Sequence, residues 1–312
     1  MPGPLPRDPF TTGDARAAGY SPRQIQQRLD SGEWIALRRG VYCTPVRNAY
    51  AHTSPRLRHE LDILAAQLAV RRLAVASRWS AAVLHGLPTP STWAGQPPPV
   101  VTLTVPIGHG KRLPGVRLRA GEVGGDQTTE ISGISATSPA RTAVDIARWA
   151  GDSADALAVT DAVLRYGDAT KEELACLLRR FAARPGHVQA RRVIAMSDPA
   201  AESPLESHSR VIFAEYDLPT PESQVEIHDL SGRLIGRVDF LWRAMDTIGE
   251  ADGRLKYTIG DVIYQEKRRE DRLRDLGFEV VRWDFADIRR SPRATADRIR
   301  AAFRRASRRR SR

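Results

Sequence analysis

Alternating apolar and polar positions near the C-terminal end of the sequence predict two neighbouring β-strands. Every second residue from Val238 to Trp242 is apolar, so these residues share one face of a strand, and Asp239 lies on the other face. The run 247–251 alternates in the same way and carries Glu250. A tight turn at residues 244–245 would join the two runs as antiparallel neighbours. Asp239 would then face Glu250, with Cβ atoms about 5 Å apart.

A third carboxylate, Asp252, follows Glu250 on the same face, so three acids are expected in one small patch. Carboxylates this close repel one another unless a cation lies between them. Oxygen ligands of this kind suit Mg²⁺, which takes one or two carboxylates from a protein and keeps several waters. The pattern favours a site for phosphodiester cleavage, or the remnant of one. The structural alternative pairs Asp239 with an arginine such as Arg237 or Arg269 and uses residues 252–253 as a hairpin turn.

The flanking pattern predicts that these strands belong to an α/β core. Ser203-Pro204 begins a helix that runs to about residue 216 and carries Glu206 on its first turn. A second helix ends at Gly277, which is typical of a C-terminal glycine signal. The expected order is helix 203–216, strands 224–228, 234–242 and 247–251, helix 261–276 and strand 278–283.

Residues 8–46 predict a small helical DNA-binding unit. Ser21-Pro22 supplies an N-cap and a first-turn proline for a helix over 22–30, whose Ile25 and Leu29 point inward. A hairpin follows over about 34–42. Two helices and a basic hairpin form the pattern of a winged helix-turn-helix, whose outward polar residues contact base edges and phosphates. The candidate DNA-binding residues are Arg23, Gln24, Gln27, Arg28, Arg38 and Arg39.

The whole chain of 312 residues is therefore expected to be a multidomain α/β protein. Helical signals dominate the middle of the chain, where a proline-rich linker at 97–99 precedes one clear strand. The expected division is a winged helix-turn-helix over 1–50, a mainly helical middle domain with a small sheet over 51–200, an endonuclease-like domain over 201–288 and a basic tail over 289–312.

Composition narrows the functional classes. Only Cys43 and Cys176 occur, so a disulfide framework or a cysteine zinc site is not expected. The sequence has neither an apolar run long enough to span a membrane nor the apolar core of a signal peptide at its N-terminus. We therefore expect a cytoplasmic protein without a membrane partner.

The net charge of +11 is concentrated at the two ends of the chain. Residues 289–312 hold eleven arginines and one acid, and residues 1–60 hold nine arginines and five acids. Two interpretations of the tail remain open at this point. It is either a solvated extension or a segment that binds nucleic acid without reading its sequence.

The N-terminal half resembles a known family. Gly-Tyr-Ser-Pro-Arg-Gln-Ile at 19–25 and Gly-Glu-Trp-Ile-Ala-Leu-Arg-Arg-Gly-Val-Tyr at 32–42 are similar to the winged-helix domain of AbiEi-type antitoxins of type IV toxin–antitoxin systems. The stretches 82–87 and 137–145 resemble the body of the same proteins. The resemblance implies DNA binding, often at the system's own promoter, and a cognate toxin. The alternative is a helical cap that only packs against the rest of the chain.

The C-terminal part resembles the PD-(D/E)XK nuclease superfamily, and more narrowly its very-short-patch-repair-type endonucleases. The stretches that carry the resemblance are 204–207, 236–240, 249–253, 256–257, 269–273 and 276–278. The resemblance implies Asp239, Glu250 and Asp252 as ligands of Mg²⁺ or Mn²⁺, Glu206 as a further acid of the site, and Lys256 beside the attacking water or the phosphate. In the superfamily a lysine follows the second acid by two positions, where this sequence has Asp252.

Two functions follow from these patterns. The first is a metal-dependent DNA endonuclease, in which the ion would lower the pKa of a bound water and the winged helix and basic tail would target the DNA. The second is a non-enzymatic, antitoxin-like DNA-binding regulator that retains a degenerate nuclease domain. The three acids with Lys256 favour the first function, and the missing lysine after Glu250 favours the second.

Overall fold

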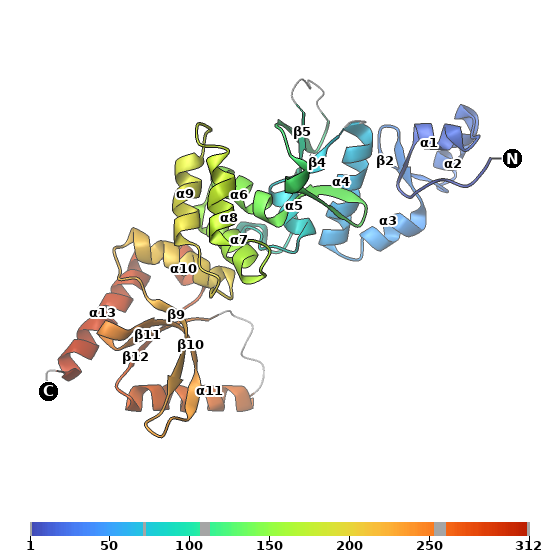
Figure 1. Ribbon diagram of the computed structural model, residues 1–312. Coiled ribbons are helices and arrows are strands. Elements are labelled where there is room, and N and C mark those ends of the chain that lie inside the picture. Colours follow the sequence, from blue (N-terminus) through green and yellow to red (C-terminus); the bar gives the residue numbers. More distant parts are fainter. Residues whose placement is uncertain (1, 71–72, 107–112, 253–259, 311–312) are drawn as a thin grey trace. The chain divides into compact units, whose positions relative to one another are not determined.

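The computed structural model describes residues 2–70, 73–106, 113–252 and 260–310. The chain forms two compact units, both of which are discontinuous in sequence. The first unit comprises residues 1–149 and 168–191, and the second comprises residues 150–167 and 192–312 (Figure 1). The two units are described separately below.

The N-terminal part of the first unit contains the expected two helices and hairpin. Helices α1 (Thr12–Ala17) and α2 (Pro22–Asp30) precede strands β2 (Ile35–Arg38) and β3 (Val41–Cys43). The short strand β1 (Phe10–Thr11) pairs with β3 and completes a sheet of order β1-β3-β2. Phe10, Ala15, Ile25 and Trp34 form the buried core. The apolar face of α2 therefore packs inward, as its sequence periodicity predicts.

The rest of the first unit surrounds a five-stranded sheet of order β6-β5-β4-β8-β7. Apolar residues of β4, β5 and β8 form a core with helices α4 and α5, including Ile63, Leu84, Leu103 and Ile134. The strands are β4 (Val75–Ala76), β5 (Val101–Val105), β6 (Val116–Ala120), β7 (Thr128–Ile131) and β8 (Ile134–Thr137). The helices are α3 (Pro45–Ala51), α4 (Pro55–Val70), α5 (Trp79–Leu84), α6 (Pro139–Trp149) and α8 (Lys171–Arg179), and α9 (His187–Met196) runs into the second unit.

The second unit is a four-stranded sheet of order β12-β11-β10-β9 with helices on both faces. Its β10 and β11 are antiparallel, whereas β11 and β12 are parallel. The strands are β9 (Glu222–His228), β10 (Leu234–Trp242), β11 (Thr247–Ala251) and β12 (Glu279–Trp283). The helices are α7 (Ser153–Arg165), α10 (Pro204–Glu215), α11 (Gly260–Asp275), α12 (Phe285–Arg290) and α13 (Pro292–Arg310).

The two faces of this sheet have separate cores. Phe240, Trp242 and Trp283 pack with α10 and α13 on one face, and Leu241 and Ile248 pack with α11 on the other. Val238 was expected beside Phe240 but belongs to the α11 core. The pairing of β9 with β10 is irregular at two places: Gln224 of β9 has a φ of 54°, and the register shifts between Leu234 and Gly236.

The basic C-terminal segment is not a loose extension. Residues 292–310 form α13, whose Ala296, Ile299, Ala302 and Ala306 are buried against the sheet (Figure 1). Several of its arginines are paired: Arg305 and Arg309 bind Glu279, and Arg310 binds Asp246. Of the two open interpretations of this segment, the solvated extension is therefore wrong for the described residues, since the apolar side chains that recur every three or four positions between the arginines form a buried face.

The compact units also differ from the expected division of the chain. Helix α7 was expected in a middle domain ending at residue 200, but it lies in the second unit with α10. Residues 292–310 belong to the same unit instead of forming a separate tail. Among the described residues, no helix has both the length and the apolar character needed to cross a membrane.

The packing of α13 predicts a specific loss of stability. Ile299 is fully buried, so Ile299→Ala should destabilise the second unit by about 2–5 kcal/mol through lost apolar contact and a cavity. Amide hydrogen exchange of β11 and β12 measures that change. Arg304→Ala, at an exposed position of the same helix, is the control and should change it by less than about 0.5 kcal/mol. Equal effects of the two substitutions would contradict a core role for α13.

Candidate functional site

Helix α2 presents a polar surface to solvent. Its N-cap Ser21 and Gln24 form a capping box, and Ile25 is the buried residue of the helix. Arg23 and Gln27 are exposed, and no described residue is seen to hydrogen-bond to either side chain. Long side chains of this chemistry at the start of a recognition helix are suited to base edges and phosphates.

Two other predicted DNA-binding residues of α2 already have structural partners. The Oε1 atom of Gln24 accepts a hydrogen bond from the Ser21 backbone N–H at 2.8 Å, so this side chain caps its own helix. Arg28 pairs with Glu33, and its guanidinium lies over the rings of Tyr20 and Trp34 at 5.2 and 5.5 Å. We therefore expect Arg23 and Gln27 to contribute more to DNA recognition than Gln24 and Arg28.

The β2–β3 hairpin carries one anchored and one exposed arginine. The Nη1 atom of Arg38 donates a hydrogen bond to the carbonyl of Pro114 at 2.6 Å. Burial lowers the pKa of the Arg38 guanidinium, although nearby Asp62 partly opposes that effect. Arg39 lies at the tip and is exposed. The hairpin is thus fixed to the sheet domain of the same unit through Arg38, and Arg39 is the residue at its tip that remains available.

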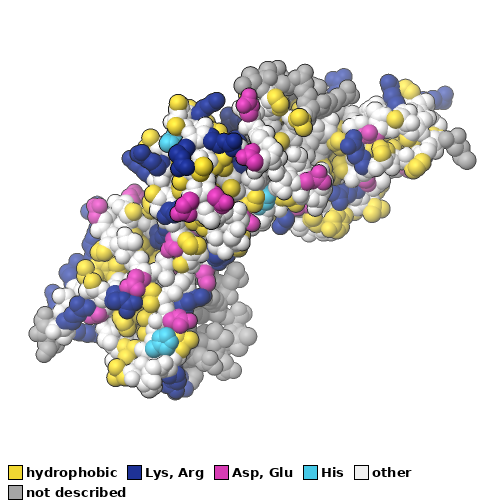
Figure 2. Space-filling view, viewed as in Figure 1, with side chains coloured by type: hydrophobic (Ala, Val, Ile, Leu, Met, Phe, Trp, Pro, Cys, Tyr) yellow, Lys and Arg dark blue, Asp and Glu magenta, His cyan; other side chains and the backbone are white. Residues whose placement is uncertain are grey.

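Exposed arginines also gather over α8 and α9, which the sequence analysis did not single out. Figure 2 shows this group as dark blue side chains beside the yellow and white surface of the two helices. Arg179, Arg184 and Arg191 are exposed, and Arg180 pairs with Asp126 at 3.0 Å. The signal was present in the sequence as arginine pairs at 179–180 and 191–192, but it was less conspicuous than the C-terminal run.

In the second unit, Glu206 and Asp239 lie close together. The Nε2 atom of Gln224 donates to Glu206 Oε2 at 2.8 Å and to Asp239 Oδ1 at 3.3 Å. The other Asp239 oxygen accepts the backbone N–H of Ala251 at 2.7 Å. Glu206 is buried and also accepts hydrogen bonds from Ser203 and from the backbone of Glu202. Gln224 was not predicted as a site residue, and its position follows from the irregular backbone of β9.

Glu250 lies beside this pair but has an arginine as its partner. The register pairs Phe240 with Gly249, so the next position places Asp239 across from Glu250. The Nη2 atom of Arg269, from α11, donates to Glu250 Oε1 at 2.8 Å. Burial is the largest effect on Glu250, and with the Asp239 carboxylate it raises the pKa to about 7 against the opposing influence of Arg269.

The third predicted metal ligand, Asp252, also has an arginine partner. Arg282 of β12 binds Asp252 at 3.3 Å and Glu270 at 3.2 Å. Lys256 lies outside the described residues. Guanidinium groups therefore compensate Glu250 and Asp252 in this structure, which is the role the sequence analysis gave to a metal ion. The donors to Asp239 and Glu206 in the described part of the chain include the neutral side chain of Gln224.

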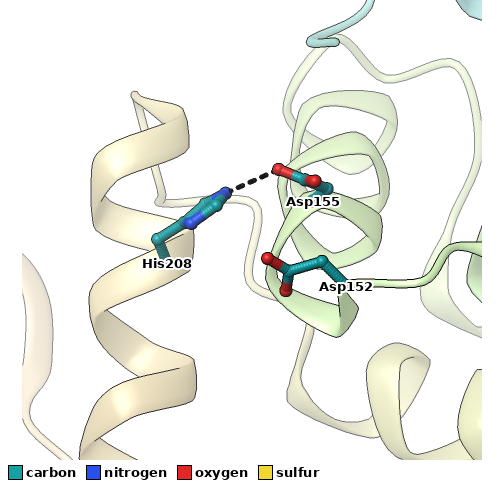
Figure 3. Close-up of side chains that lie close together, drawn as sticks. All are labelled: Asp152, Asp155 and His208. Carbon is teal, nitrogen blue, oxygen red and sulfur yellow. Dashed lines mark hydrogen bonds and ion pairs between the residues drawn. The ribbon is translucent and has the colours of Figure 1, made fainter. Parts of the chain in front are cut away.

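A different group has the spacing of metal ligands. Among the described residues, Asp152, Asp155 and His208 offer ligand atoms that all lie within 4.8 Å of one another (Figure 3). The contacts of the group favour a structural role. His208 Nε2 and Asp155 Oδ1 are 3.0 Å apart, and Asp152 caps α7 through the Ala154 N–H. The positive end of the α7 dipole and nearby Arg289 also disfavour a cation here.

Comparison with known proteins identifies the family. Residues 7–45 match the model described as "Transcriptional regulator, AbiEi antitoxin", and residues 74–194 match "AbiEi antitoxin C-terminal domain". Two Mycobacterium tuberculosis proteins, "Uncharacterized protein MT2308" of strain CDC 1551 / Oshkosh and "Uncharacterized protein Rv2248" of strain H37Rv, are each 34% identical to this chain over 228 residues. Each alignment covers 72% of this chain and 80% of the relative.

The chain belongs to the AbiEi antitoxin family. The two matched ranges contain the winged-helix pattern and the five-stranded sheet domain of the first unit. The predicted resemblance to AbiEi-type antitoxins is therefore confirmed. Neither AbiEi model reaches residues 201–288, so the nuclease resemblance of the second unit stays a prediction.

The raised pKa of Glu250 predicts a pH-dependent stability in this AbiEi protein. Folding raises the pKa of the Glu250 carboxyl from 4.5 to about 7. Between these two pH values, the carboxyl holds its proton in the folded state and releases it in the unfolded state. The associated stability is complete below pH 4.5 and is lost as the pH rises through 7. Glu250→Gln removes the titration, so it should match wild type near about pH 5 and exceed its stability by up to about 3 kcal/mol near about pH 8.

Amide hydrogen exchange of β11, followed across this pH range, measures the difference. Glu215→Gln, at an exposed position of α10, is the matched control and should follow the wild-type curve. A Glu250→Gln protein that is less stable than wild type near about pH 8 would contradict the argument. That result would mean that the ionised Glu250–Arg269 pair stabilises the fold.

Proposed function

We propose that this protein is an antitoxin-like transcriptional regulator that binds duplex DNA through its winged helix. Membership of the AbiEi family supports regulation and makes a cognate toxin the expected partner. The single observation that carries the proposal is the outward face of α2, where Arg23 and Gln27 are exposed and no described residue is seen to hydrogen-bond to either side chain. In this proposal α2 enters the major groove and Arg39 contacts a phosphate of the flanking backbone.

The residues of the proposed interface have different tasks. The capping box of Ser21 and Gln24 fixes the start of α2, and the Arg28 contacts with Tyr20 and Trp34 fix the helix to its core. The Arg38 contact with Pro114 sets the position of the hairpin. In this proposal these four side chains are positioning residues, because they hold the elements that present Arg23, Gln27 and Arg39.

Selection from a random duplex library tests this proposal. Wild type should enrich a defined sequence, and Arg23→Ala with Gln27→Ala should flatten the preference at the contacted base pairs by about 1–3 kcal/mol each. Arg39→Ala should weaken binding to all duplexes and reduce its salt dependence. Arg233→Ala, an exposed arginine of the β9–β10 hairpin, is the charge-matched control. Unchanged selection by the Arg23 and Gln27 variant would overturn the proposal.

A second candidate function is metal-dependent endonuclease activity in the second unit. The observation that favours it is the convergence of Glu206, Asp239 and Glu250 beside the irregular strand β9. Their oxygens are ligands that suit Mg²⁺ or Mn²⁺, which would activate a water for attack on phosphorus. Arg269 would have to leave Glu250 before that carboxylate became available. The regulator function is better supported, because the family models match residues 7–45 and 74–194 and do not reach Glu206, Asp239 or Glu250.

A cleavage assay separates the two candidates. Plasmid, single-stranded and mismatched duplex DNA are incubated with the full chain and Mg²⁺ or Mn²⁺, and wild type is compared with Asp239→Asn. Cleavage that requires both the metal and Asp239 would establish the nuclease function. The absence of cleavage on all three substrates, with sequence-selective binding retained, would leave a regulator with a degenerate nuclease domain.

A further inference from the structure

Two arginines of the first unit lie side by side on one face of its edge strand. Strand β6 is the edge of the five-stranded sheet and pairs in parallel with β5, so that Arg117 lies beside Thr102 and Arg119 beside Thr104. Val116 and Leu118, the alternate residues of β6, pack against the apolar core. Because side chains alternate along a strand, Arg117 and Arg119 share the face that points away from this core.

A third arginine, Arg78, approaches the same face. It follows Ser77, whose backbone N–H donates to the carbonyl of Thr102 at 3.1 Å and whose Oγ accepts from Thr104 Oγ1 at 2.9 Å. Thr102 and Thr104 are the partners of Arg117 and Arg119 in the strand register. The end of β4 therefore carries Arg78 to the side of the sheet that bears the two β6 arginines.

The backbone of Arg78 is strained. Its φ and ψ are 54° and −130°, a conformation that an L-residue other than glycine rarely adopts. Glycine would satisfy this turn without strain, so the local fold alone does not call for an arginine. A side-chain function at Arg78 accounts for a residue that the turn itself disfavours.

The positive charge at this face is not compensated within the described part of the chain. Burial is the largest cause that lowers the pKa of Arg78 to about 10, and the charges of Arg119, Arg148 and Arg117 lower it further. Asp145 raises this pKa, but its carboxylate is already paired with Arg141 at 2.9 Å and Arg148 at 3.8 Å.

The three guanidinium groups keep their hydrogen-bonding capacity available. Among the described residues, no hydrogen bond or ion pair is seen for Arg78, Arg117 or Arg119, and the Nε of Arg119 is buried without a partner. Trp149 flanks the group, with its ring 4.8 Å from the Arg78 guanidinium carbon and 46% of its surface exposed. This cation–π contact orients Arg78 without consuming its N–H donors.

We propose that Arg78, Arg117 and Arg119 form a binding site for a phosphoryl group, on the β6 face of the first unit and separate from the winged helix. Arginine forks match the paired oxygens of phosphate, and three uncompensated cations suit an anion of more than one negative charge. The exposed Trp149 ring offers an apolar edge to the organic part of the ligand. The phosphoryl group belongs either to a free nucleotide or to the backbone of a nucleic-acid strand.

Calorimetric titration of the full chain tests the site with four probes: pyrophosphate, a nucleoside triphosphate, a short single-stranded oligothymidylate and an acidic peptide. Wild type should bind pyrophosphate, and Arg117→Gln with Arg119→Gln should weaken that binding at least tenfold. Arg233→Ala with Arg243→Ala removes the same charge from exposed positions of the second unit and should leave binding unchanged. The Arg23 and Gln27 variants should also leave it unchanged, so that this test does not depend on the winged helix.

The strained position supplies a second, independent measurement. Arg78→Gly should reduce pyrophosphate binding at least tenfold while leaving the melting temperature of the ligand-free protein equal to or above that of wild type. Tighter binding of the triphosphate than of the oligonucleotide would identify a free nucleotide, and the reverse order would identify a nucleic-acid strand. The proposal would be overturned if pyrophosphate bound equally to wild type, to the Arg117→Gln and Arg119→Gln double variant and to Arg78→Gly. So would tighter binding of an acidic peptide than of any phosphate.

Discussion

The second unit depends on charge compensation inside its core. Asp161 is almost fully buried and binds Arg210 at 2.9 Å, and Ser207 also donates to it. Burial, its largest influence, raises the Asp161 pKa to about 6 despite these partners. Breaking such a pair by removing one member leaves an uncompensated buried charge, which costs about 3–5 kcal/mol. The partners come from α7 and α10, so these contacts join segments that are distant in sequence.

The same need for charge compensation explains why the sequence left two interpretations of the acids on β10 and β11. A metal ion or an arginine side chain can balance carboxylates that lie this close together. The alternation of the sequence places Asp239 across from Glu250 on two antiparallel strands, which the observed register supports, and carboxylates this close favour a compensating cation. The nature of that cation depended on α11, whose Arg269 lies nineteen positions after Glu250. No local pattern of the strands specifies which helix residue will reach them. In this structure a guanidinium lies beside Glu250, and the metal site that the sequence favours stays a prediction.

Elements with strong local signals were predicted well. The Ser21-Pro22 start of α2, the Ser203-Pro204 start of α10 and the glycine stop after α11 all appear where the sequence places them. The DNA-binding residues were predicted less completely, because composition does not distinguish a capping Gln24 or an anchored Arg38 from an available side chain. The sequence analysis left the structure of residues 289–312 open, because it considered the arginines of this segment and not the periodic alanines and isoleucine between them. Arg78 was not predicted as a functional residue, because a single sequence does not reveal which residues have a strained backbone.

The discontinuity of the two units has a consequence for synthesis on the ribosome. Helix α7 is synthesised before α10. Its Asp155 and Asp161 are buried in the folded protein. Their partners are translated later: His208, Ser207 and Arg210. Residues 168–191, which are made during this interval, return to the first unit. The nascent chain can therefore fold its first unit before α7 packs against α10. During that interval Asp155 and Asp161 remain exposed to water. Helix α7 can become part of a core only after the chain beyond residue 210 has been translated.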